Sequence, residues 1–345
     1  MKRGKQGRPV PERTGAQCLV DGLERAGVKV VFGYPGGMII DVFNLLPASP
    51  MHFVLSRHEQ GAVHMADGYA RATGRTGCCI VTSGPGATNT VTGLATAYMD
   101  GIPLVCISGQ VPTSMIGNDA FQEADITGIT LPITKHNFLV RNVDDLPRIV
   151  AEAFHIAATG KPGPVLIDLP KDVQRAKTRA TTVSPAKVAI RSYHPGCPVD
   201  EAAVDRLAKA IQAARRPLFY AGGGIIAADA APVLTEIARL AGIPVTTTLM
   251  GLGAFPEDDP LALRLLGMHG SVAANRAVAH CDLLIAAGAR FDDRVTGKIS
   301  EFAPLATLAH IDIDPSAIGK SLEIDLPIHG DVRAVLEALR GRLQP

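Results

Sequence analysis

The sequence has 345 residues and a formal net charge of +1, with 34 Lys and Arg residues against 33 Asp and Glu residues. Hydrophobic residues make up 47% of the chain and charged residues 19%, which is typical of globular rather than disordered proteins. This length suffices for two domains with separate cores. The near-neutral charge argues against nucleic acid or an anionic membrane as partners.

The cysteines and the start of the chain bear on location. The six cysteines form no paired framework and mostly lie in apolar runs, which indicates reduced thiols and a cytoplasmic protein. The first residues are basic and lack an apolar core, so we expect a disordered tail over residues 1–14 rather than a secretory signal. Residues 76–99 carry no charge but contain Gly, Pro and Asn, so they predict a buried strand, turn and helix, and no membrane span.

Residues 15–175 are expected to form a first domain. Helices are predicted over residues 15–26, 38–46, 87–98 and 146–159, with another that starts near Glu59. Strands are predicted over residues 28–32, 53–55, 101–108 and 164–169, with another that starts at Cys78. Each strand is apolar throughout, which predicts a parallel sheet with both faces covered. Residues 109–123 are long, mixed and weakly periodic, as in a functional surface loop.

A linker over residues 176–198, rich in Lys, Thr, Ser and Pro, is expected to separate this domain from a second one over residues 199–345. Helices are predicted there over residues 200–214, from Gly222 to Ala241, and over residues 332–343; strands are predicted over residues 217–221, 242–246, 283–287 and 309–313. Gly242-Ile-Pro-Val-Thr echoes Gly101-Ile-Pro-Leu-Val, so the second domain repeats the unit of the first. The expected fold class is α/β, with two doubly wound parallel-sheet domains.

Three strand ends in the first domain carry residues suited to a ligand site. They present the glycine turn at residues 33–37, the carboxylate of Glu59, and the Gly-Pro-Gly turn at residues 84–86. In a parallel sheet these ends share one edge, where α/β proteins bind ligands. A solvated Glu at a helix start is the alternative for Glu59, since the helix dipole favours a carboxylate there. The following helix has a face of small residues suited to tight packing against another copy: Gly61, Ala62, Ala66, Gly68, Ala70 and Ala72.

These stretches resemble a known family. GYPGG at 33–37, RHEQGAVHMADGYARATG at 57–74 and TSGPGATN at 82–89 are similar to the large catalytic subunit of the acetohydroxyacid synthase (acetolactate synthase) family of thiamine diphosphate enzymes. The resemblance implies a pyrimidine-binding domain followed by an FAD-binding central domain. It also implies decarboxylation of pyruvate and condensation with a second 2-keto acid, pyruvate or 2-ketobutyrate, in the synthesis of valine, leucine and isoleucine. The implied cofactors are thiamine diphosphate, FAD and Mg²⁺.

The resemblance assigns roles to residues of the first domain. Glu59 would engage the pyrimidine of the cofactor, and Gly37, with Gly36 and Met38, would present backbone N–H groups to the reacting carbonyl. The family often has Ala at the position of Met38, which leaves the pocket width open. The other implied residues are Thr82, Pro85 and Asn89 in the pyrimidine pocket of a partner subunit, Phe121 and Gln122 beside cofactor and substrate, and Lys171 at the access channel. A purely structural strand-to-helix turn is the alternative for residues 82–89. A dinucleotide fingerprint fails there, because its third glycine would fall at Asn89.

The resemblance also implies an FAD site in the second domain, where glycine turns follow the strands. Arg290 would pair with the pyrophosphate and Asp312 with a ribose hydroxyl, while Lys161 replaces an Arg that is common in the family. Met268 and Arg294 would shape the site for the second keto acid, although Arg294 could instead pair with the neighbouring aspartates. The remaining implied FAD residues are Gly223, Gly224, Thr248, Leu249, Met268, His269, Gly288, Ile313 and Asp331. No metal site is expected, because the histidines show no metal-ligand spacing.

The family also has a third, diphosphate-binding domain, with a Gly-Asp-Gly motif followed about thirty residues later by Asn that holds Mg²⁺. This motif is not found: Gly330-Asp331 leads into the last predicted helix. We therefore expect a truncated or split large subunit. The implied partners are a second copy that completes the site at the subunit interface, a small regulatory subunit, and a separate chain that carries the third domain.

Three other functions remain open. Within the same fold, pyruvate oxidase or another thiamine diphosphate decarboxylase is the nearest, whereas glyoxylate carboligase lacks the glutamate that Glu59 supplies. A non-catalytic flavin- or nucleotide-binding remnant agrees with the missing Mg²⁺ motif. A nicotinamide dehydrogenase is the weakest alternative, given the failed fingerprint.

Overall fold

The computed structural model describes residues 11–343, which divide into two compact units between Pro195 and Gly196. Of the tail expected over residues 1–14, residues 1–10 lie outside the described part of the chain. Each unit is built on one parallel sheet of six strands, which confirms the predicted α/β class. None of the helices within residues 11–343 combines the length and the apolar character that crossing a membrane requires.

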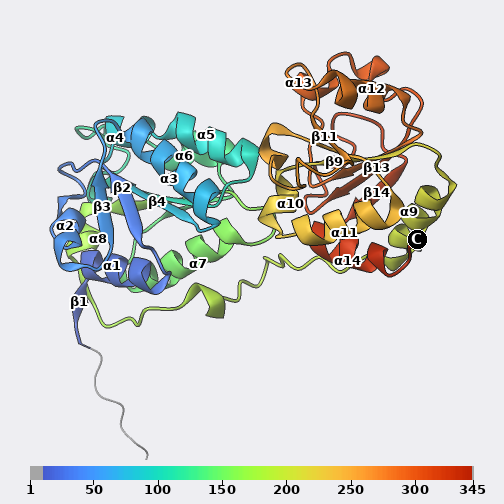
Figure 1. Cartoon of the computed structure of the whole chain (residues 1–345). Helices are drawn as coiled ribbons and strands as arrows, with labels where there is room; N and C mark the ends of the chain where they lie inside the picture. The colour runs from blue at the N-terminus through green and yellow to red at the C-terminus, as the bar shows by residue number, and fades with distance from the viewer. Residues whose placement is uncertain (1–10, 344–345) are drawn as a thin grey trace, which may run out of the picture. The chain divides into compact units, whose positions relative to one another are not determined.

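The sheet of the first unit has the strand order β3-β2-β4-β5-β7-β6, and every neighbouring pair is parallel. Its strands are β2 (Val30–Gly33), β3 (His52–Leu55), β4 (Gly77–Val81), β5 (Leu104–Gln110), β6 (His136–Leu139) and β7 (Pro164–Pro170). Its helices are α1 (Gly15–Arg25), α2 (Ile40–Phe43), α3 (Glu59–Thr73), α4 (Pro85–Thr88), α5 (Val91–Asp100), α6 (Ile126–Thr130), α7 (Leu146–Ala158) and α8 (Lys171–Arg175). Helices α1 and α7 cover one face of the sheet and α3 and α5 the other, so each face has its own apolar core (Figure 1).

Several elements of this unit differ from the sequence-based predictions. The helix expected over residues 38–46 is confined to α2, and the helix expected over residues 87–98 is divided into α4 and α5. At the division, the Thr90 hydroxyl donates to the carbonyl of Ala87 at 2.6 Å and competes with regular helix bonding. Strand β6 was not predicted, because its four residues at the edge of the sheet are two polar side chains followed by two apolar ones, which is no strand pattern.

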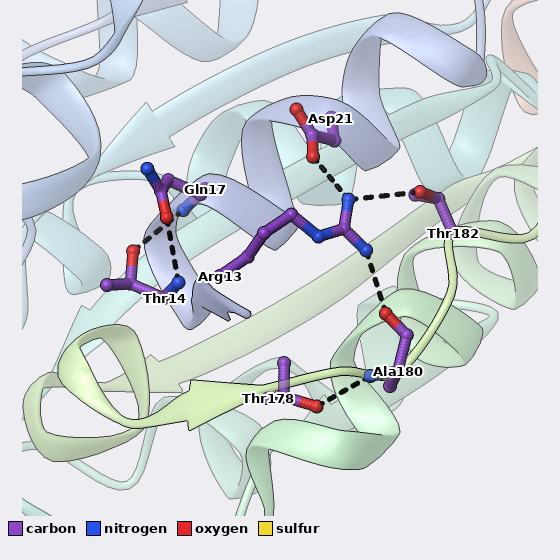
Figure 2. Close-up of polar contacts among 7 residues, drawn as sticks. All are labelled: Arg13, Thr14, Gln17, Asp21, Thr178, Ala180 and Thr182. Atoms are coloured by element: carbon purple, nitrogen blue, oxygen red, sulfur yellow. Dashed lines mark hydrogen bonds and ion pairs between the residues drawn. The ribbon is translucent and has the colours of Figure 1, made fainter. Parts of the chain in front are cut away.

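The start of the expected linker is attached to the first unit. Strand β1 (Arg13–Thr14) pairs antiparallel with β8 (Lys177–Thr178), so the expected tail does not extend to residue 14. Figure 2 shows how the Arg13 side chain joins these segments. Its guanidinium forms an ion pair with Asp21 of α1, and it donates to the carbonyl of Ala180 at 2.7 Å and to the Thr182 hydroxyl at 3.4 Å.

Replacing Arg13 with Ala is expected to lower the free energy of unfolding of the first unit by about 1–3 kcal/mol, because several hydrogen bonds of a largely buried charge are lost together. Urea unfolding of the full chain, followed by circular dichroism, measures this loss. The control is Arg25→Ala, at the exposed end of α1, which is expected to change stability by less than about 0.5 kcal/mol. Equal effects of the two substitutions would contradict this role of Arg13.

The sheet of the second unit has the strand order β11-β10-β9-β12-β13-β14, again fully parallel. Its strands are β9 (Pro217–Ala221), β10 (Val245–Thr247), β11 (Ala262–Leu265), β12 (Leu283–Ala287), β13 (Thr307–Asp312) and β14 (Leu326–His329). Its helices are α9 (Glu201–Ala213), α10 (Gly223–Ala227), α11 (Ala231–Ala241), α12 (Val272–His280), α13 (Asp293–Thr296) and α14 (Val332–Arg340). Helices α9, α11 and α14 pack on one face, and α12 packs on the other (Figure 1).

The helix predicted from Gly222 to Ala241 is interrupted between α10 and α11. Asp229 adopts a left-handed backbone conformation with φ of 52°. Pro232 then lies in the first turn of α11, where an N–H group would have no partner within the helix. Strand β11 and helix α12 were not predicted. In β11, Arg264 has a positive φ and the pairing with β10 shifts by one residue, so the strand lacks a regular alternation.

Candidate functional site

The strand order of the first sheet reverses between β2 and β4, and the loops that follow these strands leave in opposite directions. In open parallel sheets this position forms a ligand crevice at the carboxyl ends of the strands. The turn at residues 34–38 follows β2, and the turn at residues 82–84 follows β4. Glu59 follows the neighbouring strand β3, so the predicted residues meet at this edge.

Glu59 is the first residue of α3, and its two carboxylate oxygens have different surroundings. Oε2 accepts a hydrogen bond from Asn89 Nδ2 at 2.9 Å. Within residues 11–343, no hydrogen bond reaches Oε1. A Cβ atom on Gly86 would lie 3.3 Å from Oε1, so glycine leaves that oxygen open. The half-buried carboxylate is thus fixed on one side and available on the other.

Thr82 connects the turns after β2 and β4. Its buried side chain fills the space beside Gly36 and Gly86, and a Cβ atom on either glycine would overlap it. The Met38 N–H donates to the Thr82 hydroxyl at 3.4 Å. The Met38 amide, which was predicted to face a ligand, therefore has a partner within the fold. The Gly37 position has no protein atom within 4 Å of a Cβ, so its side remains open. Pro85 starts α4 at the edge of the same turn.

Two side chains of α8 support the turn after β2 from below. Lys171 Nζ donates to the carbonyl of Gly37 and lies 3.9 Å from a carboxylate oxygen of Asp41. Gln174 Nε2 donates to the carbonyl of Met38 at 2.7 Å and to that of Leu169 at 3.0 Å. Lys171 was predicted, but the buried Gln174 was missed because no motif marks it. Both fix the carbonyl groups of the turn.

The loop after β5 brings Phe121 and Gln122 to the Gly-Pro-Gly turn. Gln122 has a φ of 57°, and a Cβ atom on Gly84 would lie 2.5 Å from the Gln122 carbonyl oxygen, so the two backbones touch. The Glu123 carboxylate accepts from the N–H groups of Gly117 and Ala120 and closes the loop on itself; these backbone hydrogen bonds lower the pKa of Glu123. Phe121 is 82% exposed, a large apolar side chain with little covering it.

The strand order of the second sheet reverses between β9 and β12, and glycines of the two following turns meet there. Gly222 N donates to the carbonyl of Ala287 at 3.0 Å, and Gly224 N donates to that of Gly288 at 2.9 Å. A Cβ atom on Gly224 would lie 2.7 Å from the Gly288 Cα. The turns therefore pack backbone to backbone, and the N–H groups of Gly222 and Gly224 are used within the fold. Gly223 and Gly224 remain predicted FAD residues, and of these two Gly224 already uses its N–H group within the fold.

Other predicted residues lie in the loops that follow β10 and β11. Thr248 follows β10, and its hydroxyl accepts from Gly251 N at 2.9 Å; Leu249 beside it is exposed. Met268 and His269 are exposed in the loop after β11, and Met268 N donates to the carbonyl of Arg294 at 2.9 Å. The backbones of Met268 and Arg294 are therefore brought together, as the prediction requires.

The charged residues predicted in this unit already have protein partners. Arg290 lies 3.2 Å from a carboxylate oxygen of Asp292, and Arg294 lies 3.8 Å from one of Asp293. Asp312 ends β13, and its carboxylate accepts from Asp314 N at 2.8 Å. The neighbouring residue, Ile313, is half-buried at the same sheet edge. Asp331 caps α14 by accepting from Ala334 N at 3.0 Å, which gives its carboxylate a structural use.

Two buried side chains that sequence reasoning missed hold the turn before Asp292. The Tyr220 hydroxyl donates to the carbonyl of Arg290 at 3.3 Å, and His310 Nε2 lies 2.8 Å from that of Ala289 and so carries the hydrogen. Burial raises the pKa of Tyr220, which keeps the hydroxyl protonated as a donor. These side chains fix the backbone on which Arg290 is presented.

Lys161 lies in the first unit, in the turn between α7 and β7, with an exposed side chain. Within residues 11–343, no group of three or more His, Cys, Asp or Glu side chains is arranged to hold a metal ion.

Comparison with known proteins identifies both units. Residues 13–129 match the family described as "Thiamine pyrophosphate enzyme, N-terminal TPP binding domain", and residues 204–339 match "Thiamine pyrophosphate enzyme, central domain". The chain belongs to the thiamine pyrophosphate enzymes. The N-terminal match includes Glu59, Thr82, Asn89 and Gln122, so the first crevice lies in the domain of these enzymes that binds thiamine pyrophosphate, also called thiamine diphosphate.

Relatives of this thiamine pyrophosphate enzyme share half of its residues. An acetolactate synthase large subunit of Mycobacterium tuberculosis is 54% identical over 332 residues, which are 96% of this chain and 53% of the relative. A probable acetolactate synthase large subunit of Methanocaldococcus jannaschii is 52% identical over 95% of the chain and 56% of its own length. The acetolactate synthase isozyme 3 large subunit of Escherichia coli is 49% identical over 94% of this chain and 57% of its own length. The chain spans about half the length of the curated relatives it matches.

Proposed function

We propose that this chain is the thiamine- and flavin-binding part of an acetolactate synthase large subunit. The complete enzyme decarboxylates pyruvate and condenses the product with a second 2-keto acid, pyruvate or 2-ketobutyrate, at the first common step of valine, leucine and isoleucine synthesis. The observation that carries this proposal is the Glu59 carboxylate, with Oε2 held by Asn89 and Oε1 open, at the switch point of a thiamine-binding domain.

The first crevice fits the aminopyrimidine ring of thiamine diphosphate. Gly86 leaves open the space beside Oε1 of Glu59, and Thr82 keeps the neighbouring turns together below it. When bound, this cofactor supplies a nucleophilic carbon that attacks the keto group and accepts the electrons released with CO₂. Glu59 would hold or donate a proton at the pyrimidine, and Asn89 would orient its carboxylate. Pro85 and Asn89 would line the ring's pocket.

The other residues of the first unit would orient the substrate. Gly37, whose carbonyl is held by Lys171, would present its open side to the keto group. Gln122 would contact cofactor and substrate from the loop beside Gly84, and the exposed Phe121 would help to exclude water from them. In this proposal Lys171 acts at the entrance by fixing the turn, in addition to attracting the carboxylate of an incoming keto acid.

FAD is proposed as a structural cofactor of the second unit. Gly224 and Gly288 pack closely at the switch point, the position at which open parallel sheets bind dinucleotides. Arg290, on a turn held by Tyr220 and His310, would pair with the pyrophosphate, and Asp312 with a ribose hydroxyl. The further contacts proposed within the second unit are Gly223, Thr248, Leu249, Met268, His269, Ile313 and Asp331. Arg294, whose backbone adjoins Met268, would bind the carboxylate of the second keto acid.

The partners proposed follow from the relatives and from the length of the match. Several relatives are named large subunits, which supports a small regulatory subunit as a partner. We propose a homodimer or higher oligomer in which a second copy completes the crevice of the first unit. We also propose that the Mg²⁺ ligands come from the part of the enzyme that lies outside this chain, on the same or a separate polypeptide. The six free cysteines agree with a cytoplasmic location.

The test is product analysis after incubation with pyruvate, thiamine diphosphate, Mg²⁺ and FAD, for the chain alone and for the chain co-expressed with the neighbouring coding sequence. Acetolactate from the co-expressed pair is the expected result. Acetate or acetyl phosphate with peroxide would instead identify a pyruvate oxidase. FAD binding without turnover in either sample would indicate a non-catalytic flavin-binding protein.

A further inference from the structure

A buried carboxylate lies beside the loop that carries Phe121 and Gln122, and the site described above does not use it. Asp168, on β7, is 2% exposed and pairs in register with Ser108 of β5. The Ser108 hydroxyl donates to one carboxylate oxygen at 2.7 Å, and Gln110 Nε2 donates to the other at 2.9 Å. Both oxygens of Asp168 are therefore hydrogen-bonded to the end of β5.

Gln110 joins this carboxylate to both ends of the loop formed by residues 111–124. Its Oε1 accepts from Val111 N at 2.8 Å, where the loop begins. Its Nε2 also donates to the carbonyl of Ala124 at 3.1 Å, where the loop ends. Ala124 lies two residues beyond Gln122, whose carbonyl adjoins Gly84. The position of Gln122 therefore depends on the side chain that Asp168 holds.

Among the described residues, no cationic side chain contributes to the pKa of Asp168. The pKa of Asp168 is raised to about 7, chiefly by burial and in smaller part by Asp125 at the N-terminus of α6, while the hydrogen bonds from Ser108 and Gln110 oppose this rise. Hydrogen bonds from Gly128 N and the Thr127 hydroxyl lower the pKa of Asp125, so that residue stays charged near neutral pH. Helices α4 and α6 contain no titratable residue, and on β6 burial lowers the pKa of His136, so that it is neutral at pH 7.

We propose that Asp168 is a positioning residue which, through Gln110, holds the loop that carries Phe121 and Gln122, and that it makes closure of this loop depend on protonation. Opening the loop hydrates the carboxylate, which favours its charged form. The closed loop binds the proton more tightly than the open loop. Closure is therefore most stable at low pH, weakens progressively as the pH rises above the ordinary range of an Asp, and reaches its minimum above about pH 7.

Only the roles of Phe121 and Gln122 in this inference rest on the proposed function. The test is hydrogen–deuterium exchange of the full chain between pH 5 and 8, with the rates for residues 111–125 divided by their intrinsic rates and with α7 as an internal reference. In the native chain, protection of the loop is expected to fall at least tenfold over this range. Asp168→Asn keeps a carbonyl for Gln110 and an N–H donor toward Ser108 but cannot ionise. Its protection is expected to be at or above the native value at pH 5 and to stay constant up to pH 8.

Two further variants separate the charge from the connection to the loop. Ser108→Ala removes a hydrogen bond to the charged carboxylate without touching the loop, so protection is expected to change little at pH 5 and to fall about tenfold below the native value at pH 8. Gln110→Met removes the bond to Ala124, so protection is expected to fall at pH 5 as well. If Gln110→Met does not fold, Asp168→Asn and Ser108→Ala still test whether loop protection depends on the charge of Asp168.

A native pH response retained in Asp168→Asn, or loop protection unchanged in folded Gln110→Met, would overturn the inference. Exchange is measured without cofactor or substrate, so its outcome is independent of acetolactate formation. A failure of the proposed function would therefore be seen in product analysis and not in this experiment.

Discussion

Glu59→Gln is expected to lower acetolactate formation by the assembled enzyme at least a hundredfold, with little change in the KM for pyruvate. The substitution keeps the size of the side chain and its approach to Asn89, but it removes the carboxyl group that we propose exchanges a proton with the pyrimidine of the cofactor. General acid–base groups contribute about 10²- to 10⁴-fold to rates, which sets the expected size of the loss. Acetolactate formation at saturating cofactor measures it.

The matched control is Glu323→Gln, an exposed carboxylate of the second unit, which is expected to keep native activity. Asn89→Ala is expected to have an intermediate effect, because the carboxylate remains but Oε2 loses its partner. A Glu59→Gln enzyme with activity within twofold of the native value would exclude Glu59 from the chemistry and leave it the structural role of a residue at a helix start.

Gly222→Ala is expected to destabilise the second unit by about 3 kcal/mol or more and to abolish FAD binding. The added Cβ would overlap the carbonyl oxygen of Gly288 and lie 2.6 Å from the Ala289 Cα. These are backbone atoms at the junction of β9 and β12, so the strands must separate to accept the methyl group. Guanidinium unfolding of the full chain, with flavin fluorescence as a second probe, measures both effects.

Gly196→Ala provides the control for this substitution. Apart from its chain neighbours, no atom of residues 11–343 lies within 4 Å of a Cβ position on Gly196, and its φ is not left-handed, so its replacement is expected to shift stability by less than about 0.5 kcal/mol. Native-like unfolding and flavin binding of Gly222→Ala would show that the two turns are not packed as described.

Local patterns in the sequence were sufficient for the central elements of both sheets. Strand β12 is uniformly apolar, and α1 and α7 repeat their apolar positions at helical spacing, so their bounds differ from the predictions by one residue at most. The edge strands β6 and β11 escaped prediction because each has only four residues and neither follows a regular strand pattern. Their strand conformation comes from pairing with a neighbour rather than from their own composition.

The candidate site was predictable where a residue follows a strand in a distinctive motif, as Glu59 and Asn89 do. It was not predictable where the function of an atom depends on register between distant strands. The N–H groups of Gly222 and Gly224 are used by β12 and its turn, and the Met38 amide is used by Thr82. Asp168, Ser108 and Gln110 likewise meet only because β5 and β7 pair in this register. No spacing along the chain reveals such contacts.

The most direct test of the account is the rate at which the C2 proton of thiamine diphosphate exchanges with deuterium in the assembled enzyme, followed by proton NMR without any keto acid. We predict exchange at least a hundredfold faster than for the free cofactor, and a return toward the free rate in Glu59→Gln. Equal exchange rates in the native enzyme and in Glu59→Gln would contradict the assignment of this crevice as the site where the cofactor is activated.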